Sequence, residues 1–253
     1  MMTTQQTVEV VNCKGSDFEI GLQLARAYLK TPRGRAMKYS ETQLPVGFSF
    51  KNTQSALQDY APNIWGELHG IAEGLNISLE RAAAEFSNGR LLFPARGCSA
   101  LMSDGLYGRN YDFAPDRYDG LLAAIQPDNV YASIGFTDRI TGRDDGMNEH
   151  GLCVGLHHVN EMNWQPGLVC ILIVRIVLDQ CATTREAVDL LKRLPHGLGF
   201  NYSLLDANHN SAVVEASPTG VAVRLGSNLF CTNHFQSNEL KSENNRVWEI
   251  VEA

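Results

Sequence analysis

The spacing of apolar positions divides the chain into a helical first part and a strand-rich remainder. Over the first hundred residues, apolar side chains recur every three or four positions, which is typical of a buried helix face. The capping box Ser16-Asp17-Phe18-Glu19 predicts a helix that ends at Thr31-Pro32-Arg33-Gly34. Further helices are expected from about Gln54 to Leu75, with a break or kink at Pro62, and from a Ser78 cap to Phe86.

From Gly97 onward the apolar segments are shorter and are separated by polar turns. Strands are expected at Ser99–Ser103 and Tyr107–Phe113, joined by the turn Asp104-Gly105, and near Tyr131–Phe136 and Leu152–His158. Two helices follow, one at Leu168–Gln180 and one from the capping box Thr183-Thr184-Arg185-Glu186 to just before Pro195. A meander of four strands closes the chain, at Phe200–Asp206, Ser211–Ala216, Val221–Leu225 and Asn228–Thr232. This order predicts an α+β fold with antiparallel sheets.

Composition and charge restrict the class of protein. The chain has 253 residues, of which 44% are hydrophobic and 19% charged, so it can bury a core and wholesale disorder is excluded. Its formal net charge of −7 provides no basic footprint for nucleic acid or for an anionic membrane. A small-molecule substrate therefore fits the composition better than a polyanion.

No segment of the sequence predicts export or membrane insertion. The stretch from Met1 to Gln6 is polar and lacks the apolar core of a secretory signal. The longest apolar run, Leu168 to Leu178, has eleven residues, is interrupted by Arg175, and falls short of the roughly 20 that span a bilayer. The six cysteines form no CxxC pair, which argues against a disulfide framework or a zinc ribbon. We therefore expect a soluble, cytoplasmic protein without metal or cofactor, and leave open whether it is a homo-oligomer.

Cys98 differs from the other cysteines in its polar surroundings. The others lie on apolar helix faces, inside strands or after an apolar stretch, where a small buried side chain is the usual role: Cys13, Cys153, Cys170, Cys181 and Cys231. Cys98 follows Arg96-Gly97 at the start of the predicted hairpin. The return strand of that hairpin carries Arg109, Asn110 and Asp112.

The hairpin brings a charged residue next to the Cys98 sulfur in either of two registers. With a three-residue loop Asp112 lies directly opposite Cys98, and with a two-residue loop Arg109 is its diagonal neighbour. A nearby guanidinium lowers the pKa of a thiol and so favours the reactive thiolate. The alternative is a surface hairpin whose Arg and Asp side chains are simply solvated.

Four motifs in chain order resemble those of the cysteine N-terminal-nucleophile hydrolases. They are Gly97-Cys98-Ser99, Gly108-Arg109-Asn110-Tyr111-Asp112, Asp145-Gly146-Met147-Asn148-Glu149-His150-Gly151-Leu152 and Cys231-Thr232-Asn233-His234-Phe235. Within that superfamily the sequence resembles the acyl-CoA:6-aminopenicillanic acid acyltransferase-like family, which is related to bile-salt hydrolases and penicillin V acylases. The segment from Glu67 to Gly74 is typical of the acyltransferase branch. The resemblance extends from about residue 60 to residue 246.

This resemblance implies a four-layer αββα sandwich of antiparallel sheets and a precursor that cuts itself between Gly97 and Cys98. Residues 1–97 would then form a helical pro-segment, and residues 98–253 the catalytic core. Gly97 has no Cβ, which suits a close attack of the thiol on its carbonyl carbon. The cut would expose an α-amine on Cys98, whose pKa near ~7.7–8.0 makes it a suitable acceptor for the thiol proton.

The resemblance also implies roles for other residues. Asp112 would hold the new amine, Arg109 would keep the sulfur anionic and help place the substrate, and Asn233 would donate a hydrogen bond to the oxyanion. In bile-salt hydrolases an asparagine that helps to bind the oxyanion or the substrate ends the strand after the Asn-Glu-x-Gly turn. Here His157 stands in the corresponding place and could serve through its backbone N–H. His157 and His158 point to opposite faces of a strand, so they are not expected to share a metal ion.

One further residue of the resemblance, outside the four motifs, lies near the end of the sequence. Arg246 is similar to a family arginine that supports the nucleophile. Family members usually continue for several further strands and helices, whereas this sequence ends at Ala253. We leave open whether the sequence is truncated, whether further residues follow, or whether this member is shortened. A missing strand would leave a sheet edge unpaired.

The sequence thus predicts an enzyme that cleaves or transfers the acyl group of a small, linear N-acyl amide through a thioester on Cys98. Either water or an amine could resolve that thioester, so hydrolysis and transfer both stay open. Two other interpretations also stay open. One is a non-catalytic scaffold with the same fold that does not process itself. The other is an uncleaved hydrolase that pairs Cys98 with His157 or His234.

Overall fold

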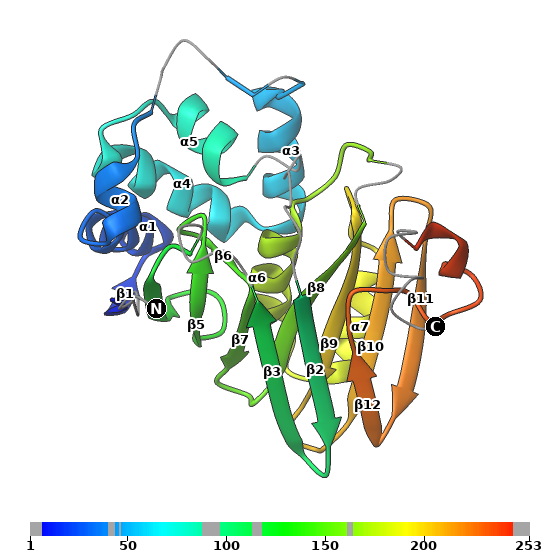
Figure 1. Cartoon of the computed structure of the whole chain (residues 1–253). Helices are drawn as coiled ribbons and strands as arrows, with labels where there is room; N and C mark the ends of the chain where they lie inside the picture. The colour runs from blue at the N-terminus through cyan, green and yellow to red at the C-terminus, as the bar shows by residue number, and fades with distance from the viewer. Residues whose placement is uncertain are drawn as a thin grey trace, which may run out of the picture. The chain divides into compact units, whose positions relative to one another are not determined.

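The computed structural model describes residues 7–39, 44–45, 47–87, 97–112, 118–160 and 164–244. The chain divides into two compact units, Met1–Asn88 with Ala114–Asp144 and Gly89–Phe113 with Asp145–Ala253 (Figure 1). Each unit combines helices with β-sheet, which confirms the predicted α+β class. The boundary expected between residues 97 and 98 concerns a chemical cut, and it stays a prediction.

The first unit packs helices against a short run of strands. α1 lies against β1, β4 and α4, and the apolar faces of α1 and α4 are fully buried. β1 pairs with β4, β4 with β5, and β5 with β6. Its elements are β1 (Glu9–Gly15), α1 (Asp17–Tyr28), α2 (Pro32–Ala36), α3 (Phe50–Tyr60), α4 (Pro62–Leu75), α5 (Leu79–Phe86), β4 (Leu121–Pro127), β5 (Ser133–Asp138) and β6 (Gly142–Arg143).

The helices of this unit follow the local signals in the sequence. Ser16 caps α1 with both hydrogen bonds of a capping box. Pro62 is the first residue of α4, so the predicted break separates two helices at Ala61. α1 ends at Tyr28, before the segment that was expected to stop it. That segment also begins α2, because the Thr31 hydroxyl accepts a hydrogen bond from the N–H of Gly34 and Pro32 suits a first helical turn.

Strand β1 shows that two expectations were wrong. The N-terminal segment is not entirely helical, and the strand pairs are not all antiparallel. Glu9–Gly15 pairs in parallel with Leu121–Pro127, far along the chain. Such a strand owes its stability to a distant partner and not to local propensity. The spacing of its own seven residues was therefore too weak a signal to reveal it.

The second unit contains two sheets. One has the strand order β7-β8-β9-β10-β11, and the other has the order β12-β2-β3; the pairs within each are antiparallel. The elements are β2 (Gly97–Ser103), β3 (Leu106–Asp112), β7 (Asp145–Asn148), β8 (Cys153–Asn160), α6 (Cys170–Gln180), α7 (Thr184–Leu191), β9 (Gly199–Leu205), β10 (Ser211–Ser217), β11 (Gly220–Gly226), β12 (Asn228–Cys231) and a 3-10 helix (Lys241–Glu243).

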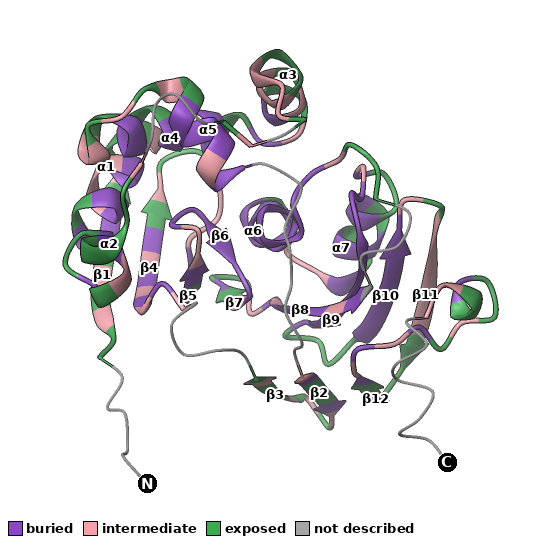
Figure 2. Ribbon diagram, turned by 45° about the horizontal axis from the view of Figure 1, so that its top comes forward, coloured by how far each residue is buried: buried purple, intermediate pink, exposed green. Residues whose placement is uncertain are grey.

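These elements form successive layers. Figure 2 shows α6 and α7 on one side of the β7–β11 sheet and the β12-β2-β3 sheet on its other side, in agreement with the packing contacts. An apolar cluster fills one end of the space between the two sheets: Ala100, Met102, Leu205, Val213, Leu229 and Cys231. The described residues of this unit thus give one helical layer and two sheets, and the complete four-layer sandwich stays a prediction.

The last strand corrects the predicted four-strand meander. β9, β10 and β11 form consecutive antiparallel pairs as expected, but β12 leaves that sheet and pairs with β2. Leu229 and Cys231 alternate with exposed residues along β12, so pairing with β2 directs both into the apolar cluster. This crossover brings the end of β12 next to Cys98 on β2.

α6 accounts for the longest apolar run in the sequence. Its side chains are almost all buried, and Arg175 forms a buried ion pair with Asp179 one turn later, with 2.7 Å between Nε and Oδ1. The charged residue that interrupts the run is therefore neutralised within the same helix. Among the residues that the structure describes, no helix is both long and apolar enough to span a membrane.

Candidate active site

The β2–β3 hairpin decides which charged residue lies beside Cys98. Asp104 and Gly105 both have positive φ, 51° and 76°, as a two-residue type I′ turn requires. Cys98 therefore pairs with Tyr111, and Arg109 pairs with Ala100. Of the two registers that the sequence left open, the structure has the two-residue one, and Arg109 is the diagonal neighbour of Cys98 on the face that points toward the other sheet.

Cys98 is buried between the sheets, with 4% of its surface exposed. Its backbone N–H donates a hydrogen bond to Oδ1 of Asn233, at 2.6 Å. Cys231 lies diagonally across from it on β12, since Cys231 pairs with Ala100. Burial raises the pKa of the Cys231 thiol, and the positive charge of Arg224 opposes the shift. By the strand registers, Cys98, Arg109 and Cys231 share one face of the β12-β2-β3 sheet.

Arg109 is held rigidly on that inner face. Its guanidinium pairs with the carboxylate of Asp145 and donates a hydrogen bond to the carbonyl oxygen of Leu156, at 2.7 Å from Nη2. The guanidinium carbon also lies 4.6 Å from the centre of the Tyr111 ring, a favourable cation–π distance. With 4% of its side chain exposed, Arg109 is a fixed positive charge in a poorly hydrated space.

Asp112 lies on the opposite face of the hairpin from the Cys98 side chain. It is exposed and pairs with Gly97. Its carboxylate nevertheless flanks the peptide bond of interest, because a Cβ placed on Gly97 would be 3.5 Å from Oδ2 of Asp112. The structure therefore places Asp112 beside the Gly97–Cys98 bond and away from the thiol. Its role in holding a new amine stays a prediction.

Asn233 binds the backbone on both sides of the site. Its Oδ1 accepts the hydrogen bond from Cys98, and its Nδ2 donates one to the carbonyl oxygen of His158, at 2.7 Å. An amide nitrogen carries two hydrogens, so the second can serve another acceptor. The side chain is 7% exposed and is oriented by these two contacts. Its expected donation to an oxyanion stays a prediction.

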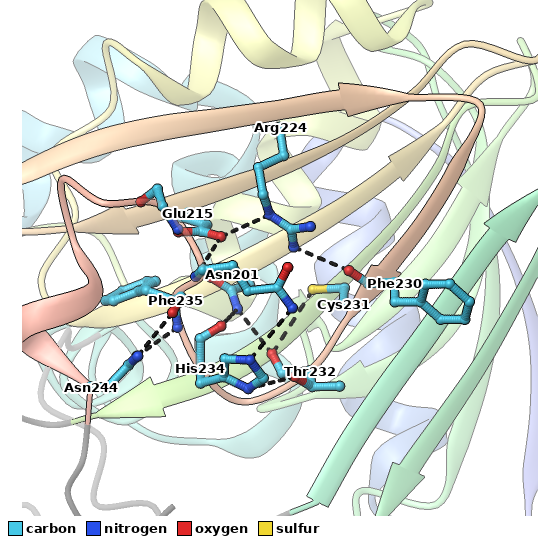
Figure 3. A network of polar contacts seen from close by, with 11 residues as sticks. Asn201, Glu215, Arg224, Phe230, Cys231, Thr232, His234, Phe235 and Asn244 are labelled. Atoms are coloured by element: carbon cyan, nitrogen blue, oxygen red, sulfur yellow. Dashed lines mark hydrogen bonds and ion pairs between the residues drawn. The ribbon is translucent and has the colours of Figure 1, made fainter. Parts of the chain in front are cut away.

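The segment that carries Asn233 is anchored by buried polar side chains, which Figure 3 shows. Nδ2 of Asn201 donates to the carbonyl oxygens of Thr232 and His234, both at 2.9 Å. Further along the loop, the carboxylate of Glu215 accepts hydrogen bonds from the backbone N–H groups of Gln236 and Ser237, each at 2.9 Å. These bonds fix the loop after β12 to strands β9 and β10.

The negative charge of Glu215 is balanced by a neighbouring arginine. Arg224 on the neighbouring strand lies 2.9 Å from its Oε1, and the same guanidinium donates to the carbonyl oxygen of Phe230 at 3.1 Å. Asn244 also holds this loop, because its side chain accepts a hydrogen bond from the N–H of Phe235 and donates one to the carbonyl oxygen of Phe235 (Figure 3). The loop that presents Asn233 is therefore held from both sides.

His157 lies on the inner face of β8, fully buried. Its Nε2 is 2.9 Å from the hydroxyl of Ser203, which in turn is 2.7 Å from the hydroxyl of Tyr107. Burial lowers the pKa of His157 well below its usual value, the charge of Arg109 lowers it further, and a backbone hydrogen bond involving Cys98 opposes the shift. The imidazole is consequently neutral at physiological pH.

His158 points to the other face of the same strand. Its ring contacts that of Phe200, with 5.3 Å between the ring centres. The two adjacent histidines therefore diverge, as the alternation of a strand requires. Within the described ranges, no group of three or more His, Cys, Asp and Glu side chains is arranged to hold a metal ion.

Gly155 makes the close packing of this site attainable, which gives a prediction about stability. A Cβ on Gly155 would lie 2.2 Å from the Tyr107 hydroxyl and 2.8 Å from Cδ of Arg109. Gly155→Ala is therefore expected to lower the free energy of unfolding by about 2–3 kcal/mol, since both side chains are packed and would have to move. Urea denaturation measures this change.

Gly108→Ala is the matched control, because Gly108 is also a strand glycine and a Cβ there meets nothing within 4 Å. We expect this variant to change stability by less than about 0.5 kcal/mol. Equal stability of the two variants would contradict the packing described for Tyr107 and Arg109.

Several buried polar residues of the site were not singled out from the sequence. Asn201 and Ser203 alternate with apolar residues along β9, and Glu215 interrupts the apolar strand β10. Polar residues at every second position of an otherwise apolar strand are an available signal for a polar inner face. Arg246, which was expected to support the nucleophile, lies outside the described residues.

Comparison with known proteins identifies relatives of this chain. The family model described as acyl-coenzyme A:6-aminopenicillanic acid acyl-transferase matches residues 101–250. The matched range begins just after Cys98 and includes Arg109, Asp112 and Asn233. No curated protein sequence is significantly similar to the chain.

Solved structures provide further similarities. Penicillin V acylase from Agrobacterium tumefaciens is 19% identical over 65% of this chain and 53% of its own, with a TM-score of 0.35. A mutant conjugated bile acid hydrolase from Clostridium perfringens is 20% identical over 52% of this chain and 51% of its own, with a TM-score of 0.37. The Caenorhabditis elegans ortholog of N-acylethanolamine-hydrolyzing acid amidase is 16% identical over 62% of this chain and 77% of its own, with a TM-score of 0.42. The chain thus spans about half the length of the first two.

Proposed function

Because the chain belongs to the acyl-coenzyme A:6-aminopenicillanic acid acyl-transferase family, we propose that it is a self-processing cysteine hydrolase or acyltransferase. Its nucleophile is the thiol of Cys98, and its substrate is a small, linear N-acyl amide. The observation that carries the proposal is the 2.6 Å hydrogen bond from the Cys98 N–H to Asn233. This hydrogen bond joins the motif that contains Cys98 to the motif that contains Asn233, at the peptide bond between Gly97 and Cys98.

Processing begins with attack of the Cys98 sulfur on the carbonyl carbon of Gly97. The C–N bond to Cys98 then breaks, a proton passes to the departing nitrogen, and Gly97 is left as a thioester on the sulfur. Water hydrolyses that ester and restores the thiol. Asn233 already binds the nitrogen that becomes the leaving group, which supports an alignment of this bond for cleavage.

After the cut, Cys98 supplies both the nucleophile and its proton acceptor. The new α-amine takes the thiol proton, and the thiolate attacks the carbonyl carbon of an acyl amide. The amine product leaves, and water or an acceptor amine resolves the thioester. Arg109, a fixed cation diagonal to Cys98, favours the thiolate, and the second N–H of Asn233 stabilises the oxyanion. A reducing compartment such as the cytoplasm would keep the nucleophile as a thiol.

The intact mass of the purified full-length protein tests this proposal. We expect two fragments, residues 1–97 and residues 98–253, and the N-terminal residue of the larger fragment should be cysteine. Release of an amine from a panel of N-acyl amides should accompany the processed form. A chain that stays whole and inactive would contradict the proposal and favour a scaffold. A chain that stays whole but cleaves amides would favour an uncleaved cysteine hydrolase.

A further inference from the structure

Asn233 lies just beyond the strand pairing that holds the residues before it. The β12–β2 ladder ends at the pair of Cys231 and Ala100. Two residues further along the two strands lie Asn233 and Cys98, which a continued ladder would pair through their backbones. The Cys98 N–H is bonded instead to the side chain of Asn233. The backbone of Asn233 therefore needs a support other than strand pairing.

Asn201 on β9 supplies that support. Its Nδ2 donates to the carbonyl oxygens of Thr232 and His234, the residues directly before and after Asn233, both at 2.9 Å (Figure 3). An amide nitrogen carries two hydrogens in one plane, so this side chain uses both of its donors to hold both carbonyl groups. A single buried residue thus fixes Asn233 from its two sides.

The neighbours of Asn201 on the sheet bind other parts of the chain. Strand pairing places it directly opposite Glu215 on β10 and His157 on β8, so the three polar side chains share one face. Glu215 binds the loop after β12 further along, at the N–H groups of Gln236 and Ser237. Of these three side chains, Asn201 is the one bonded to the residues adjacent to Asn233.

The oxygen of the Asn201 amide indicates that folding stability alone does not explain this residue. Oδ1 is buried and has no hydrogen-bond partner among the described residues. A buried acceptor without a partner lowers stability. β9 is also buried along its whole length, where apolar side chains are the usual occupants. The two carbonyl groups that the amide holds are therefore the better explanation for an asparagine at this position.

Building on the proposed function, we propose that Asn201 is a positioning residue for the Cys98 site. It holds the carbonyl groups on both sides of Asn233, and so keeps Oδ1 of Asn233 on the Cys98 nitrogen and the second N–H of that amide directed at the oxyanion. Asn201 acts on the reaction only through Asn233. A displacement of about 1 Å in a catalytic group can lower a rate about 10²-fold, so loss of this support has a measurable effect.

Asn201→Leu tests this role, because leucine has nearly the shape of asparagine but no hydrogen-bond donor. In the full-length chain, self-cleavage followed by intact mass after synthesis is expected to slow about 10–10²-fold. Amine release by the processed protein should show a similar fall in kcat with KM within about twofold of wild type, since Asn201 does not bind the substrate. Asn201→Ala, with the same expectations, provides the answer if Asn201→Leu does not fold.

Asn244→Ala is the matched control. Asn244 also makes two side-chain hydrogen bonds to the backbone of this loop, but both are with Phe235, two residues beyond Asn233. Since each variant loses two such bonds, urea denaturation should show comparable losses of stability. Asn244→Ala should nevertheless cut itself and release amine within about threefold of the wild-type rates. Equal rate losses in Asn244→Ala and Asn201→Leu would contradict a specific role for Asn201.

A double-mutant cycle separates positioning of Asn233 from a general loosening of the fold. If Asn201 acts through Asn233, adding Asn201→Leu to Asn233→Ala should lower the self-cleavage rate by less than about twofold more. If Asn201 only supports the fold, the two losses should multiply. Multiplied losses would overturn the inference even where Asn201→Leu alone is slow.

The outcomes also distinguish this inference from the function that it rests on. Wild-type rates in folded Asn201→Leu, with Cys98→Ala uncut, would overturn the positioning role and leave the proposed function standing. A wild-type chain that neither cuts itself nor releases amine would overturn both. Slow Asn201→Leu, near-normal Asn244→Ala and no further loss in the double variant support the inference.

Discussion

Cys98→Ala is expected to leave the protein as one uncut chain of 27.9 kDa that releases no amine from any N-acyl amide. The physical reason is that the sulfur forms the bond that replaces both the Gly97–Cys98 amide and the substrate amide. Without it there is no thioester, and loss of a nucleophile typically lowers a rate by more than about 10⁴-fold. Intact mass and an amine-release assay measure the two effects independently.

Cys231→Ala provides the matched control for this experiment. Cys231 is a second buried thiol between the same sheets, but it belongs to the apolar cluster, and burial raises its pKa so that it stays protonated. We expect processing and amine release within about twofold of wild type, with a stability loss of about 1 kcal/mol from the missing sulfur. Self-cleavage or amide turnover in Cys98→Ala, or their loss in Cys231→Ala, would place the nucleophile elsewhere.

Asn233→Ala is expected to have the second largest effect on activity. It removes the acceptor for the Cys98 N–H, the donor to the carbonyl oxygen of His158, and the proposed donor to the oxyanion. Removal of one oxyanion donor typically lowers kcat by about 10²–10³-fold, which corresponds to roughly 3–4 kcal/mol. Loss of these two buried hydrogen bonds should cost about 1–3 kcal/mol of stability each. Denaturation curves and kcat at saturating substrate separate these contributions.

Asn233→Asp distinguishes the two roles of the side chain. A carboxylate still accepts the hydrogen bond from Cys98, but it donates none and adds negative charge where the oxyanion forms. If Asn233 stabilises the oxyanion, kcat should fall at least as far as in Asn233→Ala. A kcat near the wild-type value would show that Asn233 only holds the scissile nitrogen, and the oxyanion role would be wrong.

The hairpin around Cys98 shows how far local signals reach. Asp104-Gly105 indicated a turn, and the motifs indicated Cys98, but two registers were compatible with the sequence. The structure has the two-residue turn, so Arg109 and not Asp112 shares a face with Cys98. Shifting a strand by one residue moves every side chain to the other face, and the choice depends on packing against the second sheet.

The strands β1 and β12 show where local signals end. β1 pairs with a strand far along the chain, and β12 pairs with β2 instead of continuing the meander. Both pairings depend on which distant segment offers a complementary edge and an apolar face. That information is absent from the spacing of residues within either strand.

The buried polar residues around Asn233 and His157 depend even more on distant segments. Asn201, Glu215 and Ser203 acquire their partners only when three strands and the loop after β12 come together. A buried polar group costs free energy unless it is hydrogen-bonded, so these side chains are tolerated because each meets a partner there.

The amino-acid sequence by itself determined the α+β class, most helix boundaries, the family and the candidate nucleophile, because caps, turns and short motifs act over a few neighbouring residues. Only the tertiary structure decided the strand register at Cys98, the sheet that β12 joins, and the hydrogen-bond partners of Asn233. Each of these depends on contacts between segments remote in the chain, whose free energies arise only once the two sheets have packed.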